Sequence, residues 1–571
     1  MVKLSAIPVA ALFALIAAST ALGSGSGEAI VTGASPTTPF SQNKQNEPTI
    51  ANDASHPKVL AAGSNDEIDE QGCDGSHCPF TAGVGVSGIY FSFDSGHSWI
   101  QPTYTGWSAR ACKGGPCTPK VGPIGTLPFY FENGLVSDGD PGVAFGPRAG
   151  ANGFSWSNGS RLYYSNLTSN FSSAPTSEAF NGAEAIAVSR TDDVRAAAAS
   201  NANAWMAPVI ISRQSSTTFS DKSQIWADNA SSSPFFGNVY VCWARFQGQE
   251  KGHAAPAQLQ VAVSSDGGNT WSEHPIGAAA NNGQRNPLDG CTVRTDSHGN
   301  AFVFGVGTVS SSGGNDFELM SVSSNGGGSW SAPAPVAGPV FQPGVFDPGL
   351  GRTTIDGIAG ARSDLAIAPS VDLANGAPSG VGATNRIVMS FVSGSINTQH
   401  VFFTESTNGG ATWATPRAVE TAGDHGIYTA PAISPNGTDV YVVYNAFTNT
   451  YRTNTSDPRN LVGVLVHATI TGPGATGAFS SINRGANGDP RGTSQNGLTA
   501  EFLGDYVYAT ATRTYGAAVW NDARFAADCS AVDTWRMSLR TAPGSVAKPA
   551  PLAVCAAAFG NSDIFSFTTA P

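Results

Sequence analysis

Charged residues are scarce in this sequence and make up only 12% of its 571 residues, against about 25% in ordinary soluble domains. Surface helices need many charged residues, so neither an all-helical protein nor a coiled coil is expected. Clusters of Lys and Arg are also missing, and the net charge is −12. Nucleic-acid binding is therefore not expected, because phosphate contacts need clustered cations. A disordered chain is excluded too, since the 41% of hydrophobic residues suffices for a large core.

Long hydrophobic runs are absent except at the N-terminus. Residues 4–22 form a mostly apolar run that follows Lys3 and ends in small residues, which is typical of a secretory signal peptide. Its apolar core is shorter than the roughly 20 residues that a membrane-spanning helix needs, and an uncleaved membrane anchor is the alternative. We therefore expect a signal peptide over 1–23 and one secreted, extracellular domain over 24–571, with no membrane partner.

Familiar catalytic motifs are missing as well. The sequence has no Gly-x-Ser-x-Gly elbow, no His-Glu-x-x-His and no phosphate-binding loop. It has no Cys-x-x-Cys pair either, although the even number of cysteines favours disulfides in an oxidising compartment. Eight cysteines allow 105 pairings. The cysteines are Cys73, Cys78, Cys112, Cys117, Cys242, Cys291, Cys529 and Cys555.

A short repeat is the most informative feature that is present. Four segments share the pattern Ser-x-Asp/Asn-x-Gly-x-Ser/Thr-Trp, at residues 92–99, 264–271, 323–330 and 406–413. The Asp or Asn side chain can accept bonds from the following backbone N–H groups, and Gly can adopt a positive φ. Because apolar strand-like runs precede these segments, the pattern predicts hairpin loops in which Trp begins the next strand.

These segments resemble the Asp-box (BNR) repeats of sialidase-like β-propellers. Two copies carry Asn325 and Asn408 where that family prefers Asp. The resemblance implies that each loop joins the third and fourth strands of a blade and lies at the periphery, away from the substrate face. We therefore interpret the repeat residues, including the four Trp, as structural.

A second repeat gives the number of blades. Seven units, about 65–90 residues apart, each begin with a short apolar strand, and in the fifth unit we expect this strand at 364–367. The sequence thus predicts an all-β fold, a seven-bladed β-propeller of four-stranded antiparallel blades, with six blades as the alternative because sialidases have six. Residues 564–567 are expected to pair with the first strands and close the ring. An acid precedes the first strand in six units: Glu47, Asp140, Asp221, Asp289, Asp364 and Asp505.

Those strand starts should meet at the propeller axis and form one concave pocket. Clustered carboxylates raise one another's pKa, which suits a general acid. They are also the oxygen ligands that Ca²⁺ uses, so Ca²⁺ stays open although no cofactor is expected. A third interpretation, besides a general acid and a Ca²⁺ site, is that each acid caps its own loop or pairs with an Arg.

The resemblance to sialidases also implies a set of roles. Those enzymes hold a substrate carboxylate with three Arg and use a Tyr–Glu pair as nucleophile with an Asp as acid–base. Their Arg-Ile-Pro motif is absent here, and the first Arg of the chain is Arg110. The candidate catalytic residues are Asp140, Asp505, Tyr506 and Glu501. The candidate substrate-binding residues are Arg285, Arg352, Arg362, His425 and Tyr428.

Taken together, these features predict a sialidase-superfamily-like exo-glycosidase that acts on extracellular glycans at the axial pocket. Two alternatives are a non-catalytic propeller that binds a glycan or a protein, and a polysaccharide lyase. Fold alone does not decide among them. The expected partner is a glycan or polysaccharide, and the protein is expected to be a monomer.

Overall fold

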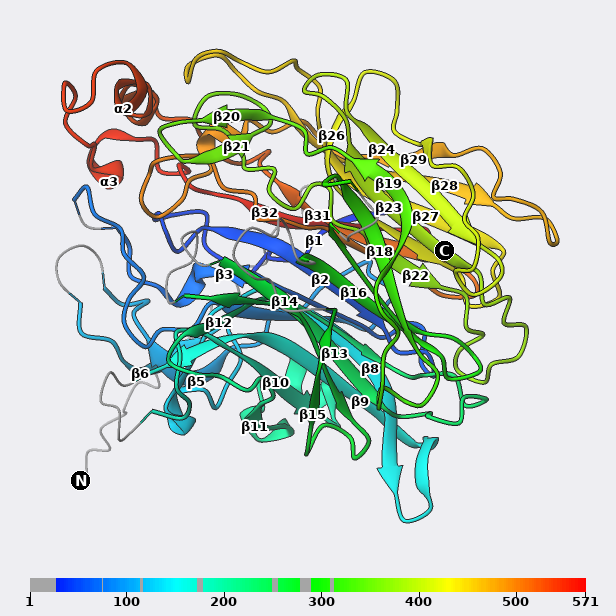
Figure 1. Ribbon diagram of the computed structural model, residues 1–571. Coiled ribbons are helices and arrows are strands. Elements are labelled where there is room, and N and C mark those ends of the chain that lie inside the picture. The colour runs from blue at the N-terminus through cyan, green and yellow to red at the C-terminus, as the bar shows by residue number, and fades with distance from the viewer. Residues whose placement is uncertain are drawn as a thin grey trace, which may run out of the picture.

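The computed structural model describes residues 27–73, 75–112, 117–171, 178–248, 255–277, 289–308 and 313–571. The predicted signal peptide (1–23) and Arg285 lie outside the described residues. Most described elements are strands, and these form seven antiparallel sheets with five further strands in small ribbons or at an edge. Along the chain the colours run round the molecule from blue through green and yellow to red, so that the last sheet returns to the first strand (Figure 1).

Seven inner strands surround the axis, one from each sheet, and each contacts the next round a closed ring. This ring confirms seven blades and excludes six. The inner strands are β2 (Gln45–Asn52), β8 (Gly142–Gly150), β12 (Thr218–Ala227), β16 (Asp289–Thr295), β22 (Ser370–Leu373), β26 (His425–Ile433) and β30 (Tyr508–Ala511).

The next two strands of each sheet continue outward by antiparallel pairing. The second strands are β3 (Leu60–Asp66), β9 (Gly153–Asn170), β13 (Val239–Gln247), β17 (Ala301–Gly307), β23 (Ile387–Ser393), β27 (Asp439–Phe447) and β31 (Gly516–Asp522). The third strands are β4 (Ser87–Ser92), β10 (Ala185–Thr191), β14 (Ala255–Ser264), β18 (Asp316–Ser323), β24 (His400–Ser406), β28 (Leu461–Thr469) and β32 (Asp563–Thr568).

A fourth strand completes six of the sheets. These strands are β11 (Trp205–Ile210), β15 (Ser272–Ile276), β19 (Ala334–Val340), β25 (Arg417–Ala418), β29 (Ser480–Arg484) and β1 (Glu28–Ile30). In the first sheet a single bridge between Phe91 and Ile100 takes this place. Pairing of β1 with β32 closes the ring, as expected for residues 564–567.

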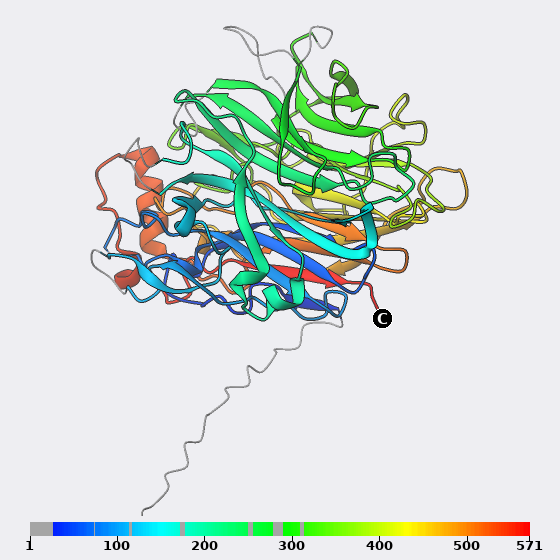
Figure 2. The ribbon, with the colours of Figure 1, turned by 90° about the horizontal axis from the view of Figure 1, so that it is seen from below.

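Other elements decorate the ring. Strand β7 (Leu135–Ser137) extends the second sheet, and two ribbons pair β5 (Tyr104–Ser108) with β6 (Lys120–Ile124) and β20 (Val345–Asp347) with β21 (Arg352–Thr354). Helices α2 (Ser530–Thr541) and α3 (Pro551–Val554) lie together at one edge of the molecule (Figures 1 and 2). No helix among the described residues is long and apolar enough to cross a membrane.

The four Trp-ended repeats form the hairpins after β4, β14, β18 and β24. In the copy at 264–271, both carboxylate oxygens of Asp266 accept bonds from Thr270, and the Ser264 hydroxyl accepts the Gly268 N–H at 2.8 Å. The second sheet has no such loop, because α1 (Val194–Ala198) follows β10 there. The hairpin geometry is therefore local and lies on the outer strands.

Packing between neighbouring sheets forms the core, with Trp243 and Trp520 among the fully buried side chains. Four disulfides add covalent links: Cys73–Cys78, Cys112–Cys117, Cys242–Cys291 and Cys529–Cys555. The third of these joins β13 of one blade to β16 of the next. One strand prediction was wrong: residues 364–367 form a turn, and the inner strand of the fifth sheet begins only at Ser370. Asp364 pairs there with Arg352 in the preceding ribbon, at 3.2 Å.

Candidate active site at the propeller axis

The starts of three inner strands share an unusual backbone feature. Glu47, Asp140 and Lys222 have φ values of 57°, 51° and 62°, in the left-handed region that non-Gly residues rarely adopt and that costs about 1–3 kcal/mol each. In β2 and β12 the strand register also shifts at this point. Bulges of this kind redirect side chains next to functional sites. Here they bring an ammonium and two carboxylates together.

Lys222 links the acids of two different blades. Its Nζ atom lies 3.6 Å from Oδ2 of Asp140 and forms a short bond with Oδ2 of Asp505. Only 10% of the Lys222 side chain and 1% of the Asp505 side chain are exposed. The three charges are therefore largely withdrawn from water. Their mutual attraction is stronger in this buried setting than it would be at the protein surface.

Arg362 completes this cluster from the opposite side. Its Nε donates to Oδ1 of Asp505 at 2.7 Å, its Nη2 bonds to the other oxygen, and Nη2 lies 3.4 Å from Oε1 of Glu47. Two parallel bonds between a guanidinium and a carboxylate fix both groups firmly. The Tyr428 hydroxyl donates to the Arg362 carbonyl at 2.7 Å and holds the backbone in place. We call Glu47, Asp140, Lys222, Arg362 and Asp505 the axial charge cluster.

Asn65 connects the Glu47 carboxylate to the backbone of Asp140. Its Nδ2 donates to Oε2 of Glu47 at 2.9 Å, and its Oδ1 accepts the backbone N–H of Asp140 at 2.8 Å. One amide on β3 thereby sets the relative position of acids from β2 and the start of β8. Two neighbouring carboxyl groups are the residue types that perform acid–base chemistry on a glycosidic bond.

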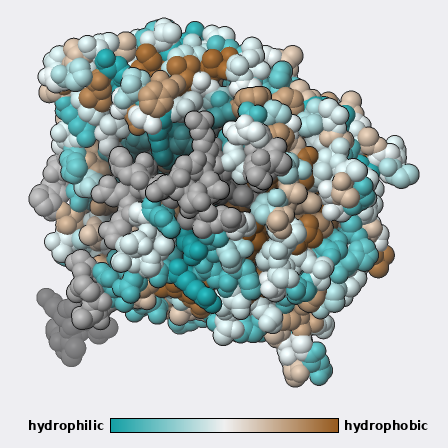
Figure 3. Space-filling view, viewed as in Figure 1, coloured by the Kyte–Doolittle hydropathy of each residue, from teal (hydrophilic) through white to brown (hydrophobic). Residues whose placement is uncertain are grey.

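A cleft of about 650 Å³ opens above the cluster, within the range of ligand pockets. Glu47, Asp140 and Arg362 line its floor, and aromatic side chains such as Phe171 and Phe502 line its walls. Lys44 and Arg362 both lie over the Phe502 ring, at 4.9 and 5.0 Å from its centre. The surface of the face seen in Figure 1 is largely hydrophilic around its hollow (Figure 3). Carboxylates beside aromatic rings suit a polyhydroxylated ligand.

The pKa values show which groups are fixed in one state. Burial acts to raise the pKa of Asp505, but Arg362 and Lys222 outweigh it and hold that pKa well below its usual range. Burial acts to lower the pKa of Lys222, but Asp140, Asp221 and Asp505 raise it well above its ordinary value. Asp289 differs, because burial raises its pKa to about 6. A carboxyl with a pKa near the working pH is suited to proton transfer.

Tyr506 is not prepared as a nucleophile in this state. Burial, reinforced by Asp140 and Glu47, raises the pKa of its phenol well above the usual value. The hydroxyl is buried and has no hydrogen-bond partner among the described residues. A phenol in this setting keeps its proton at neutral pH.

Several predicted site residues come together at the axis. Asp140, Asp505 and Arg362 belong to the axial charge cluster, and Asp505, Tyr506 and Tyr428 line a small cavity of about 50 Å³ beneath it. The expectation that inner strand starts converge is therefore met by this arrangement.

Other predicted residues lie elsewhere. Glu501 is buried beside Arg459, with which it forms a short ion pair, and it has no hydrogen bond to Tyr506 among the described contacts. Arg352 pairs with Asp364 in the β20–β21 ribbon region. His425 is half-buried at the start of β26, where burial lowers its pKa. The structure does not bring these three into the axial charge cluster.

Lys222 and Asn65 are the site residues that sequence reasoning missed. Lys222 directly follows Asp221 at the start of the third unit, at a place equivalent to Glu47. A search for any charged residue at that position, rather than for acids alone, would have found it. Asn65 has no comparable signal, because its role depends on the pairing of β3 with β2.

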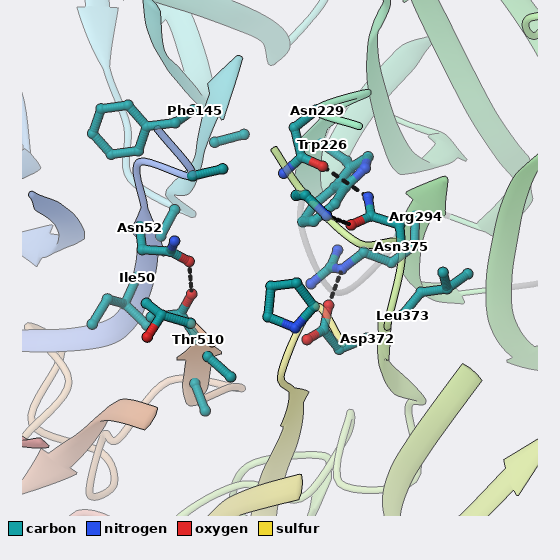
Figure 4. Close-up of a pocket in the computed structure, with 18 of the residues that line it drawn as sticks. Ile50, Asn52, Phe145, Trp226, Asn229, Arg294, Asp372, Leu373, Asn375 and Thr510 are labelled. Carbon is teal, nitrogen blue, oxygen red and sulfur yellow. Dashed lines mark hydrogen bonds and ion pairs between the residues drawn. The ribbon is translucent and has the colours of Figure 1, made fainter. Parts of the chain in front are cut away.

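The inner strands end at a third cavity of about 210 Å³, at the opposite end of the axis (Figure 4). Gln224 and Tyr508 line both this cavity and the small one beneath the cluster. The axial charge cluster thus separates the cleft from these inner spaces. Among the described residues, no group of three or more His, Cys, Asp or Glu side chains is arranged to hold a metal ion.

No protein-family model matches the chain, and none of the curated proteins does. Three similar solved structures are a protein of unknown function from Dyadobacter fermentans, a Hadza microbial sialidase and a leech intramolecular trans-sialidase. Their identities are 12%, 12% and 11%, with TM-scores of 0.36, 0.39 and 0.39. The matches cover 67%, 70% and 71% of this chain and 89%, 63% and 65% of the other chains. Sialidases are thus among the similar structures, but similarity this distant carries no argument about activity.

Proposed function

We propose that this protein is a glycosidase that removes sugar units from the ends of extracellular glycans. The observation that carries the proposal is the pair Glu47 and Asp140, which line the cleft floor while Asn65 links them. The cleft is closed below by the axial charge cluster. We infer exo-cleavage, because charged side chains at the floor would stop a glycan chain from continuing beyond them.

In this proposal one carboxyl protonates the leaving oxygen, and the other acts as base or nucleophile. Lys222, Arg362 and Asp505 hold the two groups in place and keep the floor rigid. Asn65 is a positioning residue. Tyr506 stays a candidate nucleophile, and the variant Tyr506→Phe separates the two possibilities, because it would abolish turnover only if the phenol reacts.

The test is hydrolysis of a panel of aryl glycosides and reducing-end-labelled oligosaccharides that spans neutral, amino, uronic and sialic sugars. Glu47→Gln and Asp140→Asn should each lower kcat/KM on the best substrate by at least 100-fold, and circular dichroism checks that each variant is folded at the assay temperature. Glu132→Gln, an exposed acid outside the cleft, is the matched control and should keep full activity. Full activity in both cleft variants would refute the assigned roles.

A second function, glycan binding without hydrolysis, is favoured by one observation. Asp505 forms ion pairs with Lys222 and Arg362, and the cleft residue Lys44 forms an ion pair with Glu67. The Tyr506 phenol keeps its proton, so none of these groups is prepared for catalysis. The same panel decides, because a pure binding protein would retain oligosaccharides on an array and release no sugar from any of them.

Export of the protein is part of the proposal. Four disulfides support an oxidising compartment. The measurement is N-terminal sequencing of the protein recovered from the medium of a secreting host. We expect it to begin near residue 24, and intact Met1 on a membrane-bound product would contradict cleavage.

A further inference from the structure

The cavity at the far end of the axis is built from all seven inner strands. Its wall includes Asn52, Phe145, Trp226, Arg294, Asp372, Ile433 and Thr510, each on a different strand. Its volume of about 210 Å³ is several times the roughly 30 Å³ share of one water molecule. Pro57, Arg513 and Thr514 are exposed lining residues, so the cavity reaches the surface at their side.

The hydrogen-bond network fixes which way the amides of this wall point. Oδ1 of Asn375 accepts the backbone N–H of Ala377 at 3.1 Å, so its Nδ2 must be the group that donates to Oδ1 of Asn229 at 2.7 Å. The Nδ2 of Asn229 is then left as a donor with no partner among the described residues. Figure 4 shows Asn229, Arg294 and Asp372 across the cavity from Asn52 and Thr510.

Gln224 follows the same logic. Its Oε1 accepts from the Val293 N–H and from Nη1 of Arg294, at 3.4 and 3.3 Å. Its Nε2 therefore remains a donor. Arg294 uses Nε and Nη1 for bonds to Asp372, Gln224 and its own chain, and its Nη2 has no partner among the described residues. The unused side-chain groups of Asn229, Gln224 and Arg294 are thus donors.

The charge of the wall agrees with that pattern. Among the described residues, Arg294, Arg513 and Asp372 are the charged members of this wall, which leaves one positive charge in excess in a protein whose net charge is −12. Asp372 is already satisfied, because Arg294 binds one oxygen at 3.2 Å and the Ile433 N–H binds the other at 2.8 Å. A ligand whose negatively charged group accepts hydrogen bonds from these donors would complete this site.

We propose that this cavity is a second ligand site, which binds a small organic carboxylate of about the size of a sugar acid. The ligand carboxylate would accept hydrogen bonds from Asn229 and Arg294. The hydroxyl groups of the ligand would face Asn52 and Thr510. The site is separate from the cleft, because the axial charge cluster lies between them. Its occupation does not depend on the proposed glycosidase activity.

The experiment is isothermal titration of the mature protein with D-gluconate, with D-glucose as the neutral counterpart and inorganic phosphate as the inorganic anion. Asn229 begins an Asn-x-Ser sequence, so the protein is made in a bacterial host without N-glycosylation. We expect gluconate to bind with at least tenfold higher affinity than glucose and phosphate. Binding should be unchanged in Asp140→Asn, a variant of the cleft.

Two variants address the cavity itself. Asn229→Asp keeps the shape and the bond from Asn375 but places a negative charge beside the ligand, and it should weaken gluconate binding at least tenfold. Arg294→Met should do the same, and thermal unfolding checks that each variant is folded. Asn203→Ala, an exposed Asn on the outer part of the second blade, is the control and should bind as the unchanged protein does.

Three results would overturn the proposal. The first is no gluconate binding, and the second is glucose or phosphate binding as tightly as gluconate. The third is a folded Asn229→Asp variant that binds gluconate with unchanged affinity. Loss of binding in Asp140→Asn alone would place the ligand in the cleft and would also refute the far site.

Discussion

The two ends of the same seven strands have opposite chemistry. At their starts, the left-handed residues Glu47, Asp140 and Lys222 direct charges inward, and Glu47 and Asp140 each have a cation beside them. At their ends the wall is made of small and apolar side chains, amides and aromatic rings, with Arg513 and one Arg–Asp pair as its charged groups among the described residues. Backbone geometry at the strand starts, more than strand composition, therefore decides where the charges of the axis gather.

Two buried acids show the same contrast in their titration. Asp505 lies between Arg362 and Lys222, which outweigh its burial and lower its pKa. Asp228, just after β12 at the other end, accepts a short bond from Ser233 but has no ion pair with any described residue, and burial raises its pKa to about 7. Asp505 therefore favours folding at neutral pH, whereas ionisation of Asp228 opposes it.

Removing the cation at the strand starts should have the largest effect. Lys222→Met keeps the length of the side chain but leaves Asp140 and Asp505 without their shared ammonium. We expect a loss of about 3–5 kcal/mol in the free energy of unfolding, the usual result of breaking a buried ion pair from one side. Urea unfolding measures it, with exposed Lys58→Met as a control that should stay within about 0.5 kcal/mol. A loss below about 1 kcal/mol for Lys222→Met would contradict a buried cluster.

The acid at the strand ends should produce a pH-dependent effect. The pKa of Asp228 is about 7 in the folded protein and about 4 when unfolded, so the folded state keeps a proton that the unfolded state releases. The contribution of Asp228 to the free energy of unfolding is therefore greatest below pH 4. It falls as the pH rises from 4 to 7, and it does not change further above pH 7. One unit of pKa corresponds to about 1.4 kcal/mol, so a shift of about three units gives about 4 kcal/mol of lost stability.

Asp228→Asn tests this directly, because an amide does not titrate. Unfolding free energies are measured for both proteins between pH 4.5 and 8.5, and the difference between them removes the contribution of other acids such as Asp563. We expect the variant to gain stability relative to the original protein as the pH rises. A difference that stays constant with pH would show that Asp228 is ionised throughout.

Asn65→Leu should have an intermediate effect at the strand starts. It removes the amide that bonds to the Glu47 carboxylate and to the Asp140 N–H. Leaving these buried partners unsatisfied should cost about 1–3 kcal/mol, read from the shift in the urea midpoint. If stability is unchanged while the cleft keeps its activity, Asn65 does not position the two acids.

The smallest effect is expected far from the axis, in the hairpin repeats. Oδ1 of Asn408 accepts the Thr412 N–H, and its Nδ2 donates to the Thr412 hydroxyl. In Asn408→Asp that hydroxyl can turn and donate instead, as Thr270 does to Asp266. Thermal unfolding should show a change within about 0.5 kcal/mol, and a change above about 1 kcal/mol would mean that the two loop types are not equivalent.

Sequence reasoning worked where a local pattern repeats. Each Trp-ended loop and each apolar strand could be recognised alone, and their spacing predicted seven blades. It failed at 364–367, where an acid followed by apolar residues looks like a strand start but lies in a turn held by the Arg352–Asp364 pair. It also placed Glu501 near Tyr506 because they are close in sequence. The Glu501 side chain instead pairs with Arg459, far along the chain.

The amino-acid sequence alone determined the all-β class, the number of blades and the convergence of acids at the axis, because these follow from periodic local patterns. Only the tertiary structure decided which charges are neutralised, since Lys222, Asp505 and Arg362 come from three different blades or connecting segments and meet only when the ring closes. It also decided that the axis is divided into a charged end and an amide-lined end. Burial and long-range ion pairing set both outcomes, and neither leaves a pattern within any single repeat.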